Sequence, residues 1–151
     1  MILTQDEFEA ILNDASKYVK EDIFWRPEGI WFKFRTSLIT KSTNYSLFLQ
    51  GTHNPHIPTL SYTLICPPRT RIYALDLGKD HRNPDGELVG EIHKHRWSEV
   101  YHDKQAYCPL DITACASDPI GVWKQFCDEA MIDHNGVMHP ITIPQDLDLF
   151  P

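Results

Sequence analysis

Residues 30–35 are Ile-Trp-Phe-Lys-Phe-Arg and residues 60–66 are Leu-Ser-Tyr-Thr-Leu-Ile-Cys. In the first stretch apolar side chains recur at every second position, which is the period of a β-strand with one buried face. Similar runs occur at residues 45–51 and 71–77, and turn-forming residues lie between the runs. Because no helical pattern separates these four predicted strands, we expect them to pair antiparallel through short loops.

Two predicted helices bracket the strands. The first, over residues 4–20, begins with a capping box at Thr4 and continues with apolar residues at helical spacing. The second, over residues 118–134, has Asp118 as its N-cap and Pro119 at its first position. The sequence therefore predicts one helix at each end of the sheet-forming region.

The order of elements predicts an α+β fold. Short strands at 88–97 and 106–110 bring the expected antiparallel sheet to about five or six strands, with the C-terminal helix packed on one face. A chain of 151 residues is long enough for one domain. We expect a single globular domain over residues 1–136, followed by a C-terminal tail over residues 137–151 that contains three prolines.

Composition excludes several classes of protein. Apolar residues make up 42% of the chain, with 4 Trp, 6 Tyr and 7 Phe, which argues against intrinsic disorder. No apolar run is long enough to cross a bilayer, and the acidic start does not resemble a signal peptide. The four cysteines contain no C-x-x-C pair, so free thiols are expected. These features predict a cytoplasmic protein without a membrane partner, and they leave the oligomeric state open.

Charge is distributed unevenly along the chain. The net charge is −7, yet residues 23–75 carry six bases against one acid. Residues 1–22 and 117–151 each carry six acids. Two interpretations stay open: the basic middle forms a face that binds anions, or its bases neutralise the terminal acids within the fold.

Histidines concentrate in the segment between residues 81 and 107. Its densest part contains His93 and His95, which would share one face of a strand, while Lys94 and Arg96 would share the other. Two imidazoles at this spacing lie roughly 6–7 Å apart, since each strand residue rises about 3.3 Å. That separation suits two ligands of one metal ion, or an acid and a base that act on one phosphodiester.

A metal-independent ribonuclease needs the second arrangement. RNA carries its own nucleophile, the 2′-hydroxyl, so that cleavage requires a base, an acid and a cation that stabilises the phosphate. The predicted catalytic residues are His81, His93, His95, Arg96 and Tyr107. The predicted RNA-binding residues, which are aromatic or basic, are Trp31, Lys33, Arg35, Arg82 and Lys104. This hypothesis needs no cofactor.

Three alternatives remain. A metal ion would take His81, His93 and His95 as ligands. A non-enzymatic acidic inhibitor would use the net negative charge to bind a host protein. Finally, the histidine segment could be a solvated edge strand without a chemical role.

Residues 81–112 resemble a signature of an uncharacterised family of small bacterial and phage proteins. The signature is H-x-N-P-D-G, then H-x-H, then D-K-x-A-Y, and the family also opens with an L-T-x-x-E-F helix like that at residues 3–8. The matching residues are His81, Asn83, Asp85, Gly86, His93, His95, Asp103, Lys104, Ala106 and Tyr107. The resemblance covers the first helix and residues 75–112 and implies no particular activity.

More distantly, the segment resembles TumE-like toxins of toxin–antitoxin pairs. That resemblance implies a barnase–EndoU–colicin–RelE-like fold that cleaves RNA without a metal, although the Arg-Trp pair here stands in a different order relative to H-x-H. The implied partners are RNA or a cognate antitoxin-like protein. We therefore expect an endoribonuclease-like or RNA-binding toxin-type protein of prokaryotic or phage origin.

Overall fold

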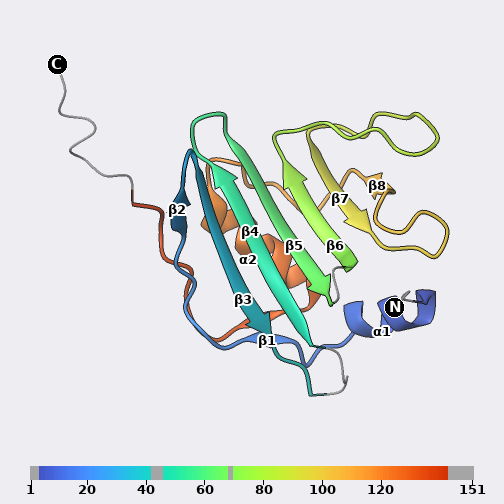
Figure 1. Cartoon of the computed structure of the whole chain (residues 1–151), viewed down its shortest axis with the longest axis horizontal. Coiled ribbons are helices and arrows are strands. Elements are labelled where there is room, and N and C mark those ends of the chain that lie inside the picture. The colour runs from blue at the N-terminus through green and yellow to red at the C-terminus, as the bar shows by residue number, and fades with distance from the viewer. Residues whose placement is uncertain (1–3, 42–45, 68–69, 143–151) are drawn as a thin grey trace.

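A computed structural model describes residues 4–41, 46–67 and 70–142 (Figure 1). The predicted strand start at Tyr45, Arg69 of the basic middle, and residues 143–151 of the predicted tail lie outside the described residues. The elements in chain order are α1 (Gln5–Leu12), β1 (Tyr18–Val19), β2 (Arg26–Glu28), β3 (Trp31–Leu38), β4 (Leu47–Asn54), β5 (Thr59–Cys66), β6 (Thr70–Leu77), β7 (Ile92–Arg96), β8 (Ala106–Tyr107), α2 (Pro119–Ala130) and β9 (Asp133–His134).

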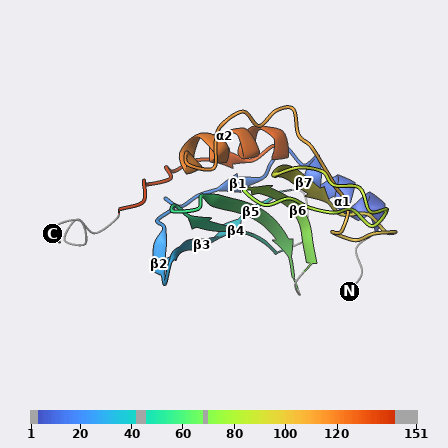
Figure 2. The ribbon, with the colours of Figure 1, turned by 90° about the horizontal axis from the view of Figure 1, so that it is seen from above.

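The main sheet has seven strands in the order β2-β3-β4-β5-β6-β7-β8, and all neighbouring strands are antiparallel. α2 lies across one face of this sheet, and α1 lies beside it near β6 (Figures 1 and 2). The predicted α+β class and the C-terminal helix on one face are therefore confirmed. None of the helices in the described ranges combines the length and apolar character that a bilayer span requires.

The sheet has more strands than predicted, because the segment before Gly29 is a strand and not only a turn. Arg26 pairs with Lys33 and Glu28 pairs with Trp31 across a tight turn in which Gly29 has a φ of +65°. A strand containing Pro27 is tolerated here because β2 is an edge strand, where a missing N–H faces no neighbour.

Both helices are shorter than predicted. α1 ends at Leu12 and not at residue 20, because Lys17 folds back and its ammonium donates to the carbonyls of Ile11 and Leu12. Burial lowers the pKa of Lys17 to about 8. Val19 keeps its predicted burial, but on β1, which pairs parallel with β9. α2 ends at Ala130, since Met131 adopts a left-handed φ of +57°.

The core lies between α2 and the sheet and is largely aromatic. Tyr62 of β5 packs against Trp123 and Phe126 of α2, with ring centroids 5.1 and 5.8 Å apart. Phe34 of β3 packs edge-on against Trp123 at 5.8 Å. Met138, from the start of the predicted tail, is also buried in this core.

The opposite face of the sheet carries a row of polar residues. Register pairs Lys33 with Thr52, Thr52 with Ser61, Ser61 with Asp76, and Asp76 with His93, one residue on each strand from β3 to β7. Because side chains alternate between faces along each strand, this row points away from α2.

All four cysteines have free thiols, as expected from the absence of C-x-x-C pairs. Cys66 and Cys127 are buried, whereas Cys108 and Cys115 are exposed. The prediction of free thiols is confirmed.

A substitution at Gly51 of β4 would test how tightly the core is packed. A Cβ added at Gly51 would overlap the ring of Phe34, which lies directly over it. We expect Gly51→Ala to lower the free energy of unfolding by about 1–3 kcal/mol, the usual cost of overpacking. Urea denaturation measures this cost. In a Phe34→Leu background the same change should cost clearly less, and an equal cost in both backgrounds would contradict this packing.

Candidate functional site

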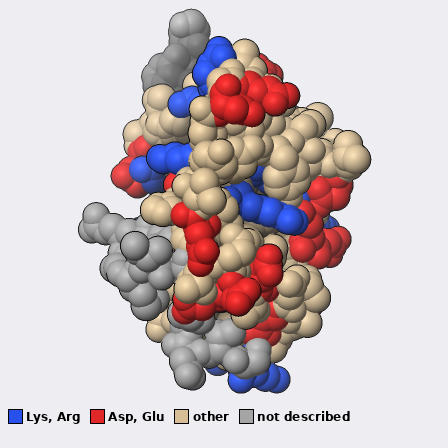
Figure 3. Space-filling model, turned by 90° about the vertical axis from the view of Figure 1, so that its right-hand side faces the viewer, with Lys and Arg blue, Asp and Glu red and all other residues tan. Residues whose placement is uncertain are grey.

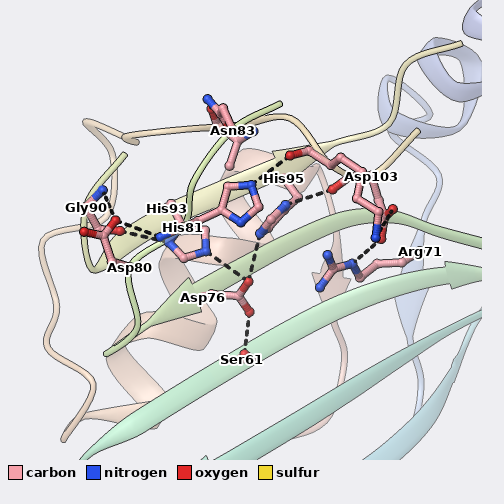
Figure 4. A network of polar contacts seen from close by, with 12 residues as sticks. Ser61, Arg71, Asp76, Asp80, His81, Asn83, Gly90, His93, His95 and Asp103 are labelled. Carbon is pink, nitrogen blue, oxygen red and sulfur yellow. Dashed lines mark hydrogen bonds and ion pairs between the residues drawn. The ribbon is translucent and has the colours of Figure 1, made fainter. Parts of the chain in front are cut away.

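Three histidines predicted from sequence meet on the open face of the sheet. His93 and His95 project from β7, and His81 reaches them from the loop after β6 (Figure 4). One ring nitrogen of each lies within 4.8 Å of the others, and the ring centroids are 4.5–5.3 Å apart. His93 and His95 are only 3% and 2% exposed, whereas His81 is half-buried. The predicted convergence of these three residues is present in the structure.

Asp76 of β6 completes the cluster. Its Oδ2 lies 3.3 Å from His93 Nε2 and 3.1 Å from His95 Nε2. The hydroxyl of Ser61 donates to the other carboxylate oxygen, Oδ1, at 2.5 Å. Register explains this arrangement, since Asp76 faces Ser61 on one side and His93 on the other. One oxygen of Asp76 is thus fixed by Ser61 and the other faces two imidazoles.

Each of the three imidazoles also contacts a backbone carbonyl. The pairs are His81 Nε2 with Lys104 O at 2.8 Å, His93 Nδ1 with Gly90 O at 3.0 Å, and His95 Nδ1 with Asp103 O at 2.9 Å. Because a carbonyl only accepts hydrogen bonds, the ring nitrogen that faces it carries the proton. For His93 and His95, the nitrogen on the other side of the ring is the one that faces Asp76.

The loop of residues 81–86, which contains the H-x-N-P-D-G signature, is held against β8. The side-chain amide of Asn83 donates to the Ala106 carbonyl at 2.9 Å and accepts from the Ala106 N–H at 2.8 Å. Asp80 accepts from the backbone N–H groups of His81 and Gly90. The H-x-N-P-D-G segment therefore has a structural role, which is to place His81 beside the two strand histidines.

Burial and hydrogen bonding act in opposite directions on the charges of the cluster. Burial raises the pKa of Asp76, but hydrogen bonds from His93, His95 and Ser61 together hold that pKa well below its ordinary value. Burial lowers the pKa of His93, and its hydrogen bonds to Asp76 and Gly90 outweigh this effect, so that the net pKa is raised. Without a metal ion, Asp76 is therefore ionised and stabilises protonated His93.

The cluster forms one wall of an open pocket of about 380 Å³. Arg71, Lys79 and Lys104 bring three cationic side chains to this pocket, and Trp31 borders it. Arg71 is oriented by Asp103, which accepts from its Nε at 2.8 Å. The pocket thus combines a histidine–carboxylate cluster with a cationic wall, as expected of a site for an anionic ligand.

Two residues predicted to be catalytic lie on the wrong side of the sheet for this pocket. Arg96 and Tyr107 project toward α2, where both contact the carboxylate of Glu129. The cause is the two-residue period of β7: His93 and His95 face the pocket, so Arg96 must face the other way. The expectation that Arg96 and Tyr107 act with the histidines is therefore corrected.

On the α2 side, these residues belong to an ionic network around the buried ammonium of Lys94. Lys94 is fully buried and its ammonium binds Asp111, at 2.8 Å, and Glu129 of α2. Tyr73 also donates to Glu129. Burial lowers the pKa of Lys94, while Asp111 opposes this shift. The network ties β6 and β7 to α2 from behind the histidine cluster.

The predicted RNA-binding residues are divided by the structure. Trp31 and Lys104 border the pocket. Lys33 pairs with Glu28 at 3.5 Å, and the guanidinium of Arg35 lies over the ring of Phe48. The remaining residue, Arg82, donates to the carbonyl of Gly86 in its own loop. Lys33, Arg35 and Arg82 do not border this pocket.

Sequence reasoning missed four residues of the site: Ser61, Arg71, Asp76 and Lys79. Asp76 did carry a signal, because it is a lone acid inside the apolar run Ile-Tyr-Ala-Leu-Asp-Leu at 72–77. A carboxylate in such a strand needs partners if it is to stay charged. Ser61, Arg71 and Lys79 carry no comparable signal, since their roles depend on which strands are neighbours.

The hypothesis of an acidic inhibitor predicts a single acidic surface. Figure 3 shows the side of the molecule that lies to the right in Figure 1, and there the acidic side chains form several separate groups with basic ones between them. Among the residues that the structure describes, this side of the molecule therefore shows no continuous acidic patch.

Comparison with known proteins places the chain in a family without assigning an activity. A family model described as "Family of unknown function (DUF6978)" matches residues 3–132. No curated protein and no solved structure matches the chain. The predicted resemblance to a family without a known function is therefore confirmed. The proposed signature and the relation to TumE-like toxins stay predictions. With most of its length matched, the chain belongs to the family DUF6978.

Proposed function

We propose that His81, His93, His95 and Asp76 bind a transition-metal ion, with Zn²⁺ as the first candidate, and that the ion serves hydrolysis of an anionic substrate in the adjacent pocket. One observation carries this proposal: each imidazole is fixed by a backbone carbonyl, and the other ring nitrogens of His93 and His95 face the same carboxylate oxygen. Histidines that bind metals are usually oriented through their other nitrogen in this way. Geometry thus favours the metal alternative over the expectation of no cofactor.

The distances within the cluster support the same interpretation. Asp76 Oδ2 lies 3.1 and 3.3 Å from the Nε2 atoms of His95 and His93. Ligands of a tetrahedral Zn²⁺ with bonds of about 2.0–2.1 Å are separated by roughly 3.4 Å. The two Asp76–imidazole separations are therefore already close to that value, whereas the three imidazole nitrogens, which lie within 4.8 Å of one another, would draw together around the ion. Three imidazoles and one carboxylate are also a donor set that Zn²⁺, Fe²⁺, Co²⁺ and Ni²⁺ accept.

The pocket explains why the proposal extends to hydrolysis. A metal ion held by His81, His93, His95 and Asp76 would supply Lewis-acid chemistry to a substrate or water in this pocket. Arg71, Lys79 and Lys104 would hold an anionic substrate within the same space. The ionic network behind β7 keeps the ligand-bearing strand in place during this reaction.

Metal binding is testable on the purified protein. Isothermal titration of the chelator-treated protein with ZnCl₂ should show one equivalent bound. His93→Ala and Asp76→Ala should each weaken binding strongly, and Ser61→Ala should weaken it about 10-fold or more, since it loosens the carboxylate. His56→Ala, a change of an exposed histidine outside the cluster, is the matched control and should bind like wild type. Equal Zn²⁺ affinity in the His93→Ala and His56→Ala variants would exclude this centre.

A second candidate is the metal-independent cleavage of RNA expected from the sequence. The observation in its favour is the raised pKa of His93, which makes a protonated acid available beside a cationic wall. His81 or His95 would then act as the base, and Arg71 would take the phosphate-holding role expected of Arg96.

The two candidates predict opposite effects of a chelator. If the protein cleaves RNA without a metal, cleavage of a labelled RNA should continue in EDTA and should be lost in His93→Ala and His95→Ala. Arg71→Lys should reduce cleavage, because a point charge does not replace a bidentate guanidinium. Arg96→Lys, on the opposite face, is the control and should leave cleavage unchanged. Cleavage that stops in EDTA and returns with Zn²⁺ would instead support the metal centre.

A further inference from the structure

We infer that the pocket binds a nucleoside phosphate, with the base stacked on Trp31 and the phosphate held by Arg71, Lys79 and Lys104 beside the histidine cluster. This inference rests on one part of the proposed function, namely that this pocket is the functional site. It does not require a bound metal ion. It names the class of substrate, which can be a free nucleotide or one unit of a single strand.

Trp31 is available for stacking, unlike the other tryptophans. Trp25, Trp97 and Trp123 all pack against neighbouring aromatic rings. Trp31 has no such ring partner among the described residues, is half-buried, and borders the pocket. An aromatic side chain at the edge of a cationic pocket is the usual platform for a nucleobase, because every base presents a π-face.

The cationic side chains keep hydrogen-bond donors that can meet a phosphate, although two of them also pair with Asp103. The Nε of Arg71 binds Asp103, and no ion pair reaches its terminal nitrogens within the described residues. The side chain of Lys104 is 73% exposed, and its ammonium lies 4.0 Å from a carboxylate oxygen of Asp103, which is a long distance for an ion pair. Lys79 is also exposed. The acid Asp80 also borders the pocket, but its Oδ1 already accepts two backbone N–H groups. The terminal nitrogens of Arg71 and the exposed ammonium groups of Lys79 and Lys104 therefore favour an anionic ligand.

The floor of the pocket offers polar groups for a sugar. Thr52 and Ser61 lie on it beside Asp76. Thr59, which is 6% exposed, also borders the pocket, and its hydroxyl has no hydrogen-bond partner in the described part of the chain. A buried hydroxyl without a partner is costly unless a ligand or water satisfies it. A volume of about 380 Å³ is at the lower end of small-ligand pockets, roughly 300–1,000 Å³, and therefore suits one nucleotide unit.

The test compares three ligands that share parts of one structure. Isothermal titration of AMP, ribose 5-phosphate and adenosine should be done on the Zn²⁺-treated and on the EDTA-treated protein. We expect AMP to bind roughly 10-fold or more tightly than ribose 5-phosphate, which is the usual gain from stacking one base. Equal affinity for AMP and ribose 5-phosphate would overturn the stacking role of Trp31, and no binding of either phosphate would overturn the inference as a whole.

Variants separate the base site from the phosphate site. Trp31→Leu should remove the preference for AMP over ribose 5-phosphate but keep phosphate binding, whereas Trp31→Phe should retain most of the preference. Lys104→Gln should weaken both phosphates by the same factor. Phe48→Leu, a change on the same face outside the pocket, is the control and should leave the affinities for AMP and ribose 5-phosphate unchanged. Retention of the full AMP preference in a folded Trp31→Leu protein would contradict the inference.

The same titrations distinguish a free nucleotide from a nucleic-acid strand as the ligand. They also test the nucleotide site and the metal centre separately. Tighter binding of a short single-stranded oligonucleotide than of AMP identifies a strand as the ligand, and equal binding identifies a free nucleotide. AMP preference that persists in EDTA, in a protein that binds no Zn²⁺, would reject the metal centre while keeping the nucleotide site. Zn²⁺ binding without any AMP binding would do the reverse.

Discussion

The contact between the Asp76 carboxylate and the two imidazoles of β7 is the constraint on which the site depends. Asp76 lies on the open face of β6, and its carboxylate needs partners if it is to stay charged. On the neighbouring strand, its register partner His93 and also His95 supply them. Ser61 on the other neighbouring strand fixes the second oxygen. Because three adjacent strands supply these groups, the pairing of the sheet itself sets their geometry, and little is left to side-chain flexibility.

The same strand is held from its other face. Lys94 lies between His93 and His95 in sequence but points toward α2, where it binds Asp111 and Glu129. Ion pairs with one fully buried partner add little net stability, but the pair between Lys94 and Glu129 joins β7 directly to α2. His81 is fixed separately, through the double hydrogen bond between Asn83 and Ala106. Strand pairing, an ionic network and a turn thus converge on one cluster.

Sequence periodicity was sufficient for the strands and for the division of β7 into two faces. Alternation predicted β3 to β7 within a few residues and separated His93 and His95 from Lys94. It failed for the end of α1, where the apolar spacing continues into β1, and for β2, where no strand was predicted. Arg71 joins the site through strand order and register, which depend on contacts between distant segments and leave no local pattern. Asp76 stands out locally as a lone acid in an apolar run, but its partners are set by the same register.

The central claim is that three imidazoles and one carboxylate hold a metal ion, and X-ray absorption at the zinc K-edge of the Zn²⁺-loaded protein tests it most directly. A bound Zn²⁺ should show a first shell of nitrogen and oxygen at about 2.0–2.1 Å with the outer-shell scattering of three imidazoles. In the His81→Ala protein that scattering should fall to two imidazoles. A shell of oxygen alone, or an imidazole count that His81→Ala leaves unchanged, would contradict the account.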